Sequence, residues 1–247
     1  MALKTRKKCV NCSFNHLRSG GLKRNAIMSE RLFAIGDIHG CFGPFCELVE
    51  QKIRFRKGDR LVLLGDYIDR GYQTREVLDY IIDLKESGHD VITLKGNHES
   101  MMLEALENEQ SLYNWFLNGG YETLYSFGVE SVNDLNIKYL HFLRNLPLYY
   151  IQDQYMFVHA GFNDEIPDPL SDQFQMIWSR KESYSNPFFN NKIIVHGHTP
   201  VPLTVCREAL LSRNRVINID TGCVYDEWGG YGHLTAIELF SRELYSV

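Results

Sequence analysis

Five short apolar runs in this sequence are each followed, within a few residues, by a polar side chain of a metal-binding type. Continuous apolar runs punctuated by glycine are typical of strands that are buried on both faces of a sheet. Sites in α/β proteins form just outside the carboxyl ends of such strands, so we expect these polar side chains to converge. The runs and their polar residues are Leu32–Ile35 with Asp37, Leu61–Leu64 with Asp66, Val91–Leu94 with Asn97, Tyr155–Val158 with His159, and Ile193–Val195 with His198.

Helical patterns separate these runs. Apolar residues recur at spacings of three and four over Phe45–Lys52 and Arg75–Glu86, as in amphipathic helices. The alternation of strand and helix predicts a layered α/β fold. A long helical stretch over about 98–146, broken at Gly119-Gly120, predicts a helical insert or cap on the sheet. The last part of the chain predicts a second sheet, and hence a sandwich of two sheets flanked by helices, with strands at Leu203–Val205, Val216–Ile219 and Leu234–Leu239.

The charge of the chain is divided unevenly along its length. The chain has 247 residues and a formal net charge of −5, but residues 1–28 hold seven Lys and Arg and no acid. The rest of the chain therefore carries −12. We expect this basic head (residues 1–28) to be a disordered extension, or translated sequence upstream of a start at Met28. Residues 29–247 are expected to form a single domain.

Composition argues against several classes of protein. No apolar run approaches about 18 residues, so we expect no membrane span. The mild acidity argues against a dedicated nucleic-acid binder, so a nucleic-acid or membrane partner is considered only for the basic head. Six scattered cysteines do not form a disulfide framework, which favours a reducing, cytoplasmic compartment. Cys9, Cys12 and His16 have zinc-like spacing, but the head lacks the fourth ligand of a structural zinc site.

The polar residues at the strand ends form a chemically coherent set. A single histidine after a strand is more often structural than a ligand, but here the pattern recurs at five ends. Imidazole, carboxylate and amide groups without thiolate suit Mn, Fe or Zn. Six protein ligands are too many for one catalytic ion with an open position, and they fit two ions that share a bridging carboxylate. The set comprises Asp37, His39, Asp66, Asn97, His159 and His198.

These residues also lie in recognisable motifs. The motifs resemble those of the phosphoprotein phosphatase (PPP) family of the metallophosphoesterases, in the form of bacterial and phage serine/threonine protein phosphatases. The resemblance covers about residues 31–240 and leaves the basic head outside. It implies a metallophosphoesterase-type sandwich of two mixed β-sheets flanked by helices, with the helical insert at about 98–146. The motifs are Gly36-Asp37-Ile38-His39-Gly40, Gly65–Gly71 (GDYIDRG), Gly96-Asn97-His98-Glu99, His159-Ala160-Gly161 and His196–Pro200 (HGHTP).

The resemblance implies a role for each metal ligand and a reaction. A hydroxide that bridges two divalent ions would attack phosphorus directly, so that no Ser or Cys nucleophile is needed. Manganese is favoured for both ions, with iron or zinc as alternatives. The first ion would be bound by Asp37 and His39, the second by Asn97, His159 and His198, and both by Asp66.

The same resemblance implies a proton donor and phosphate-binding groups. His98 matches the family's general acid, and Asp69 would orient it and raise its pKa. Arg70, and Arg180 in the segment Trp178-Ser179-Arg180, would bind phosphate oxygens through their planar guanidinium groups. For Arg180 the alternative is a solvated helix end.

Five neighbouring residues are expected to have lesser roles. Cys41 is interpreted as a packing residue, and Glu99 as a helix-start carboxylate that complements the helix dipole. His196 is interpreted as support for the metal ligands. Tyr225, together with Trp228, is expected to close a hairpin rather than to border a substrate groove.

The function predicted from these motifs is metal-dependent hydrolysis of phosphomonoesters on proteins. The expected substrates are phosphoserine and phosphothreonine proteins or peptides, with phosphotyrosine as a further candidate. The alternative is a dinucleoside polyphosphate hydrolase of the diadenosine tetraphosphatase type, which would share the fold and the ions. Asp69 favours the phosphatase, because the dinucleotide hydrolases tend to have a neutral residue there. A catalytically inactive binding module is disfavoured because all six ligand positions are intact.

Overall fold

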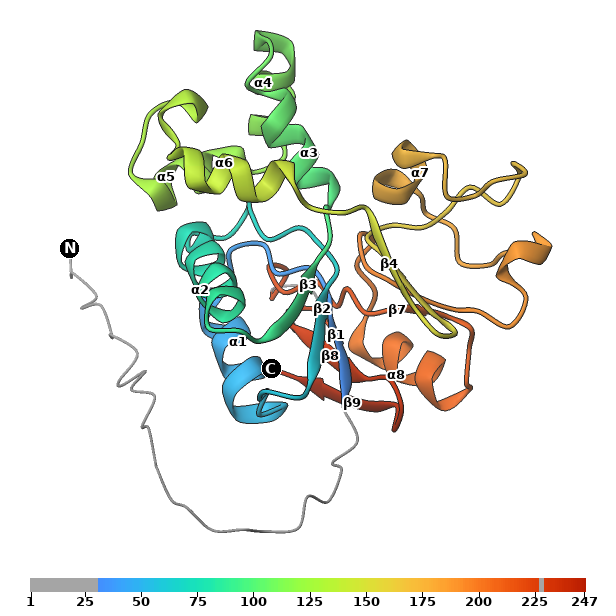
Figure 1. Cartoon of the computed structure of the whole chain (residues 1–247). Helices are drawn as coiled ribbons and strands as arrows, with labels where there is room; N and C mark the ends of the chain where they lie inside the picture. The colour runs from blue at the N-terminus through green and yellow to red at the C-terminus, as the bar shows by residue number, and fades with distance from the viewer. Residues whose placement is uncertain (1–30, 227–228) are drawn as a thin grey trace.

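The first sheet of the protein holds three of the predicted strands in parallel. In this computed structural model the described residues are 31–226 and 229–247, and Figure 1 shows their arrangement. The strand order is β3-β2-β1-β8-β9, with β8 antiparallel to β1 and β9 antiparallel to β8. The strands are β1 (Leu32–Ile35), β2 (Arg60–Leu63), β3 (Asp90–Thr93), β8 (Thr235–Glu238) and β9 (Glu243–Ser246).

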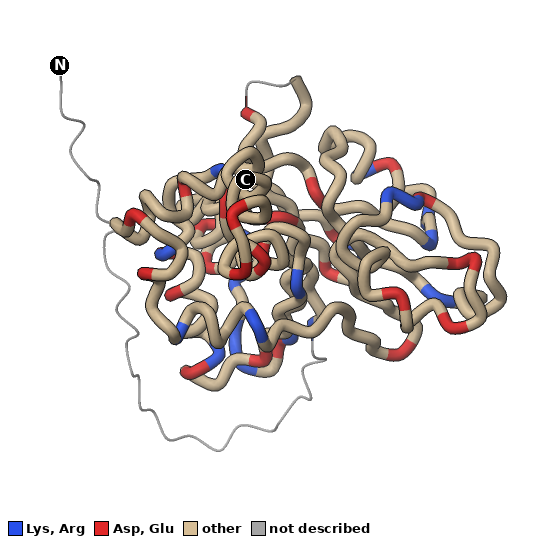
Figure 2. The backbone as a smooth tube through the Cα atoms, turned by 90° about the horizontal axis from the view of Figure 1, so that it is seen from above, with Lys and Arg blue, Asp and Glu red and all other residues tan. Residues whose placement is uncertain are grey.

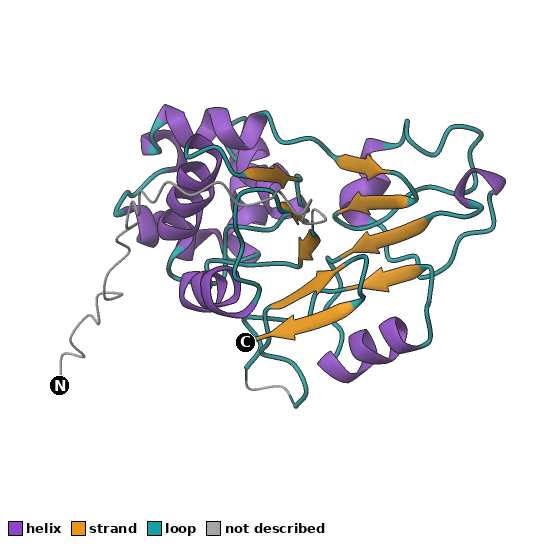
Figure 3. Ribbon diagram, turned by 60° about the horizontal axis from the view of Figure 1, so that its bottom comes forward, coloured by secondary structure: helices purple, strands orange, loops and turns teal. Residues whose placement is uncertain are grey.

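The second sheet repeats this mixture of parallel and antiparallel pairs. Its order is β4-β5-β6-β7, and only the edge strand β4 runs antiparallel to its neighbour. Figure 3 shows the strands of the two sheets lying side by side, with helices around them. The predicted sandwich of two mixed sheets flanked by helices is therefore confirmed. The strands are β4 (Tyr149–Gln152), β5 (Tyr155–Val158), β6 (Ile193–His196) and β7 (Val216–Asn218).

Alternate residues of the strands point into different layers, as strand geometry requires. Leu32 and Ala34 of β1 pack with Phe157 and Val195 of the second sheet, so this layer lies between the sheets. Phe33 and its alternate neighbours face the helices on the other side of the first sheet. Burial on both faces explains why β1 reads as a continuous apolar run.

Helices cover the outer face of the first sheet, and a helical insert continues beyond β3. The insert lies over the carboxyl ends of the strands (Figure 1), and Gly119 interrupts it with a left-handed backbone, φ 98°. The predicted insert and its break are confirmed. The covering helices are α1 (Phe42–Glu47), the π-helix Leu48–Lys52 and α2 (Thr74–Glu86), and the insert holds α3 (Asn97–Glu104), α4 (Glu109–Leu117), α5 (Gly120–Phe127), the 3₁₀ turn Val132–Asp134 and α6 (Ile137–Arg144).

One predicted strand is wrong. Leu203–Val205 begins α8 (Leu203–Leu211) instead of a strand. The local preference of Val205 for a strand is overridden because Cys206 and Leu210, four residues apart, are the residues that become buried, while Val205 is 46% exposed. Short helices α7 (Gln173–Trp178) and Pro187–Phe189 complete the second half of the chain.

Two further strands, β4 and β9, have no counterpart among the predicted elements.

Basic and acidic positions are mixed along the described part of the chain, as Figure 2 shows. Within residues 31–226 and 229–247, no helix has the length and the apolar character needed to cross a bilayer. The expectations for the basic head, including the start at Met28, concern residues outside those described.

Candidate active site

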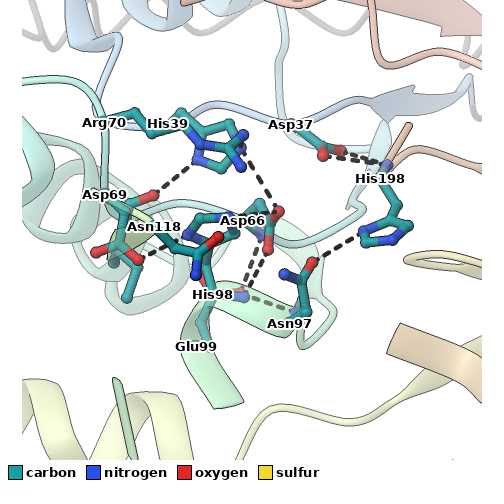
Figure 4. A network of polar contacts seen from close by, with 12 residues as sticks. Asp37, His39, Asp66, Asp69, Arg70, Asn97, His98, Glu99, Asn118 and His198 are labelled. Atoms are coloured by element: carbon teal, nitrogen blue, oxygen red, sulfur yellow. Dashed lines mark hydrogen bonds and ion pairs between the residues drawn. The ribbon is translucent and has the colours of Figure 1, made fainter. Parts of the chain in front are cut away.

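The polar residues that follow the strands meet at one place. β1, β2 and β3 are parallel to one another, and so are β5, β6 and β7, so the carboxyl ends of each set lie at one edge. Figure 4 shows side chains from the turns beyond these ends facing one another. Contacts link all six predicted ligands into one cluster: Asp37, His39, Asp66, Asn97, His159 and His198.

Three of these residues form a compact triangle of ligand atoms. Asn97 Oδ1 lies 2.9 Å from His159 Nε2 and 2.9 Å from His198 Nδ1, and the two nitrogens are 3.2 Å apart. Ligands that sit about 2.1 Å from one ion at right angles are about 3 Å apart. The triangle therefore has the spacing of three ligands on one face of a metal ion.

The protonation of His159 supports a cation at this triangle. His159 Nδ1 lies 3.0 Å from the carbonyl oxygen of Leu64, and a carbonyl can only accept a hydrogen bond. In the neutral ring, Nε2 then carries a lone pair that faces the oxygen of Asn97. His198 Nε2 is buried without a hydrogen-bond partner, and it carries the ring proton when Nδ1 offers its lone pair to the triangle. A divalent ion placed among these oxygen and nitrogen lone pairs fits this donor set.

A second group of ligand atoms shares Asp66 with the first. Ligand atoms of Asp66, His159 and His198 lie within 4.8 Å of one another, and so do those of Asp66, His39 and His98. His39 Nδ1 contacts the carbonyl oxygen of Ile68 at 2.9 Å, which leaves Nε2 for the group. Because Asp66 belongs to both groups, its position suits the predicted bridge between two ions.

Asp37 reaches the cluster beside a carboxylate that the sequence analysis did not select. Asp37 accepts hydrogen bonds from the backbone N–H of His198 and contacts the side chain of Asp220. Burial and neighbouring carboxylates raise the pKa of Asp37 well above its usual range and that of Asp220 to about 7. Asp220 follows β7 in the same way that Asp66 follows β2. The pattern of an apolar run followed by a polar side chain also applies to Val216–Ile219, and it would have identified Asp220.

The buried imidazoles are held neutral. Burial is the main cause that lowers the pKa of His159 and His198 to about 3, of His98 to about 4, and of His39 well below its usual range. A neutral imidazole offers a lone pair to a metal ion. The expectation that Asp69 raises the pKa of His98 is not met, because the loss of solvent around the ring outweighs the nearby carboxylates.

His98 is oriented by a carboxylate that the helical insert holds in place. His98 Nδ1 lies 2.7 Å from Asp69 Oδ2. Asp69 also accepts hydrogen bonds from Trp115 Nε1 at 2.9 Å and from Thr123 Oγ1 at 2.7 Å. Trp115 and Thr123 are fully buried and belong to α4 and α5. They were missed in the sequence because nothing in their spacing connects them to Asp69.

The two predicted phosphate-binding arginines reach the cluster from different loops. Arg70 Nη1 lies 2.8 Å from His39 Nε2 and donates toward it. Arg180 Nη1 donates to Thr199 Oγ1 at 3.0 Å, next to His198. Arg180 is exposed and thus remains free to approach a ligand. Both guanidinium groups border the metal-type ligands, where they can meet a phosphate.

The backbone at the site is strained. Five of the ten non-glycine residues with positive φ in the described part of the chain belong to the cluster. Only a small left-handed region is open to such residues, and each costs of the order of 1–3 kcal/mol. Strain of this kind concentrates at functional sites. The five are His39 (φ 45°), Asp66 (φ 52°), Asp69 (φ 70°), Arg70 (φ 68°) and His198 (φ 73°).

Hydrogen bonds to the Glu99 carboxylate secure the turn that carries Asp66. Glu99 lies in the first turn of α3, as predicted. Its Oε2 accepts from the backbone N–H groups of Asp66 at 2.9 Å and Gly96 at 2.8 Å, and its Oε1 accepts from that of Tyr67 at 2.8 Å. Glu99 therefore ties the turn that carries Asp66 to the helix that bears Asn97.

The remaining singled-out residues lie close by. His196 is buried at the end of β6, and its Nδ1 faces the carbonyl oxygen of Gly197 at 3.1 Å. The ring of Tyr225 lies 5.8 Å from the guanidinium carbon of Arg70. Tyr225 therefore borders the site, contrary to the expectation of a hairpin role alone. Trp228 lies outside the described residues.

Comparison with known families agrees with this geometry. The calcineurin-like phosphoesterase family matches residues 30–225. The chain belongs to the calcineurin-like phosphoesterase family, whose members are hydrolases that use divalent metal ions.

Relatives within this family carry different names. The chain is 27% identical to the asymmetrical bis(5'-nucleosyl)-tetraphosphatase PrpE of Anoxybacillus flavithermus, over 86% of this chain and 92% of the relative. It is 26% identical to serine/threonine-protein phosphatase 2 of Salmonella typhimurium, over 73% of this chain and 84% of that protein. A serine/threonine phosphatase structure from Saccharomyces cerevisiae matches with a TM-score of 0.63 and 16% identity, covering 90% of this chain and 80% of the other, which shows the fold.

Proposed function

We propose that this phosphoesterase hydrolyses phosphomonoesters of serine and threonine on proteins or peptides, with phosphotyrosine as a further candidate substrate. The observation that carries the proposal is the pair formed by His98 and Asp69, whose ring nitrogen and carboxylate are 2.7 Å apart. A serine or threonine alkoxide is a poor leaving group, so its departure needs a proton donor. The oriented His98 ring can hold that proton.

The proposed cofactor is a pair of divalent ions, with manganese favoured over iron and zinc. Asp37 and His39 would bind one ion, Asn97, His159 and His198 the other, and Asp66 both. When bound, the ions supply positive charge and activate a water molecule for attack on phosphorus. The ligand triangle and the Nε2 lone pair of His159 support this assignment.

The remaining residues of the site act on the substrate. The Arg70 and Arg180 guanidinium groups would bind the equatorial oxygens of the phosphate and offset the charge that grows in the transition state. With Nδ1 directed at Asp69, the Nε2 of His98 faces the cluster, 3.9 Å from Asp66 Oδ2. To pass a proton to the leaving oxygen, the ring must first take one up at Nε2, and the negative charges of Asp66 and of a bound phosphate favour that charged form.

A second candidate function is hydrolysis of dinucleoside polyphosphates. The support for it is the match to the asymmetrical tetraphosphatase over most of both chains. Its leaving group is a nucleotide phosphate, which is much more acidic than an alcohol and leaves without a proton donor. The need for His98 therefore separates the two functions.

A leaving-group comparison tests the proposal. The purified enzyme with Mn²⁺ is assayed on a phosphothreonine peptide, on p-nitrophenyl phosphate and on diadenosine tetraphosphate. We expect His98→Asn to lower turnover of the peptide by about 10²–10⁴-fold, the usual contribution of a general acid, and to affect p-nitrophenyl phosphate far less. His141→Asn, at an exposed position on α6, is the matched control. Turnover of diadenosine tetraphosphate without turnover of the peptide would favour the second function.

A further inference from the structure

Two cysteine side chains lie in contact at the rim of the site. The thiols of Cys41 and Cys223 are hydrogen-bonded to each other, although 182 positions separate them in the sequence. Cys41 Sγ also donates to the carbonyl oxygen of His39, at 3.7 Å. The two thiols therefore form a short chain that ends on the backbone of a candidate metal ligand.

Each cysteine belongs to a different wall of the site. Cys41 precedes α1 and ends the turn that carries Asp37 and His39. Cys223 lies in the segment after β7, between Asp220 and the ring of Tyr225 that lies over Arg70. A covalent bond between the cysteines would join these two walls.

The other cysteines of the described chain are in different surroundings. Cys46 and Cys206 are both buried, on α1 and α8. Cys41 and Cys223 are both partly exposed, so an oxidant in solution can reach them. Exposure to the oxidant and a neighbouring second thiol are two features of cysteines that form reversible disulfides.

We propose that Cys41 and Cys223 form a reversible disulfide that lowers the turnover of the enzyme. Hydrogen peroxide is the oxidant. It oxidises one thiol to a sulfenic acid and releases water, and the second thiol then attacks that sulfur and releases a second water. Two thiols lose two electrons in total, and the peroxide gains them. The thiols are hydrogen-bonding partners, so forming an S–S bond of about 2 Å needs only a local approach of the two side chains.

The disulfide would fix the Cys223–Tyr225 segment against the turn that ends at Cys41. The guanidinium group of Arg70 lies under Tyr225 and contacts His39, so it would lose freedom to adjust to a phosphate. Reduction by a thiol such as dithiothreitol restores both cysteines.

Peptide mapping tests the covalent part directly. The full-length chain with Cys9→Ser and Cys12→Ser is treated with hydrogen peroxide, alkylated, and digested with trypsin without reduction. We expect residues 32–52, which hold Cys41, to appear linked to residues 216–242, which hold Cys223. Because residues 32–52 also contain Cys46, Cys46→Ala is the matched control and should keep the link, whereas Cys41→Ser and Cys223→Ser should abolish it.

Turnover of p-nitrophenyl phosphate tests the functional part. We expect peroxide to lower turnover by about tenfold, and dithiothreitol to restore it. Cys223→Ser should match the reduced enzyme and resist peroxide, and Cys223→Ala repeats the test if the serine variant folds poorly. No linked peptide, sulfinic acid alone at Cys41, or a linked peptide without loss of turnover would each overturn the proposal. The mapping needs no substrate, so it stays readable if the proposed phosphoprotein activity fails.

Discussion

At the scale of single residues, the candidate site is defined by shared partners. Asp66 belongs to both groups of ligand atoms, and Asp69 accepts hydrogen bonds from two helices of the insert while it holds His98. A change at one such residue therefore affects several functions at once. Two substitutions separate positioning from chemistry.

Thr123 tests how much the insert contributes to orienting His98. Thr123→Val keeps the shape of the side chain but removes the hydroxyl that donates to Asp69. A hydrogen bond to a charged group is worth about 1.5–3 kcal/mol, so we expect turnover of a phosphothreonine peptide to fall by about one to two orders of magnitude. Thr123→Ser keeps the hydroxyl and should retain activity. An equal loss on p-nitrophenyl phosphate would contradict a role through His98.

Gly96 tests the space beside Asp66. A Cβ at Gly96 would overlap Asp66 Oδ1 and come within 2.6 Å of the Asp66 backbone nitrogen. We expect Gly96→Ala to displace Asp66 and to abolish tight Mn²⁺ binding in a calorimetric titration. Gly43→Ala is the matched control, because nothing lies within 4 Å of its Cβ. Binding of Mn²⁺ by Gly96→Ala with unchanged affinity would show that Asp66 is not the shared ligand.

The sequence predicted the cluster but not the groups around it. Asp37, Asn97 and the others follow apolar runs, which is a local pattern that can be read along the chain. Trp115 and Thr123 meet Asp69 across 46 and 54 residues, and that contact depends on how the insert folds back. Such contacts have no local signature.

At the scale of elements, the segment between β5 and β6 positions Arg180. Asp164 accepts hydrogen bonds from Lys181 and from the backbone N–H of Ser185 at 2.8 Å. The Lys181 ammonium group is the main cause that lowers the pKa of Asp164 to about 2. Asp164, which precedes Arg180 in the chain, is therefore tied to two residues that follow it, Lys181 and Ser185.

The pH dependence of stability tests these contacts. A depressed pKa in the folded state means that ionised Asp164 stabilises the fold above its ordinary pKa of about 4, and that this contribution is lost as pH falls toward 2. We expect Asp164→Asn to lower the free energy of unfolding by about 1–2 kcal/mol at pH 7. In urea melts the difference from wild type should shrink between pH 4 and pH 2. Glu165→Gln, 80% exposed, should change stability by less than about 0.5 kcal/mol.

Element prediction succeeded where burial made the pattern continuous. β1, β2, β3, β5 and β6 are apolar runs, and α2 shows the helical spacing. The strand prediction for Leu203–Val205 was wrong because three residues are too few to distinguish a strand from the first turn of α8. The edge strand β4 is only partly buried, so its sequence shows no clear alternation of apolar and polar residues.

At the scale of the whole molecule, the site collects negative charge inside the fold. Asp37, Asp66 and Asp220 are each at most 3% exposed. Buried carboxylates that repel one another destabilise the folded state until cations neutralise them. Metal binding should therefore stabilise the entire domain, since a ligand that binds only the folded state shifts unfolding.

Thermal unfolding measures this linkage. We expect Mn²⁺ at about 100 times its Kd to add about 2.7 kcal/mol of stability, and a chelator to remove that gain together with activity. Asp66→Asn, which weakens both groups of ligands, should lose most of the increase in Tm. Activity that survives complete chelation would rule out the two-ion proposal.

The arrangement of the two sheets could be expected only through the family resemblance. Runs of apolar residues indicate strands, but they do not say which strands pair. The order β3-β2-β1-β8-β9 places β8, from the end of the chain, next to β1. That pairing brings together segments about 200 residues apart, and no periodicity in the sequence encodes it.

The left-handed backbone at His39, Asp66, Asp69, Arg70 and His198 has a consequence for how this protein can evolve. Glycine adopts that conformation without strain, so a glycine at such a position would relieve the backbone. Selection for stability alone would therefore favour replacing these five side chains with glycine. Under the proposed function, these side chains are a cost in stability that the chemistry requires, so laboratory selections for heat tolerance should yield inactive variants unless activity is screened in parallel.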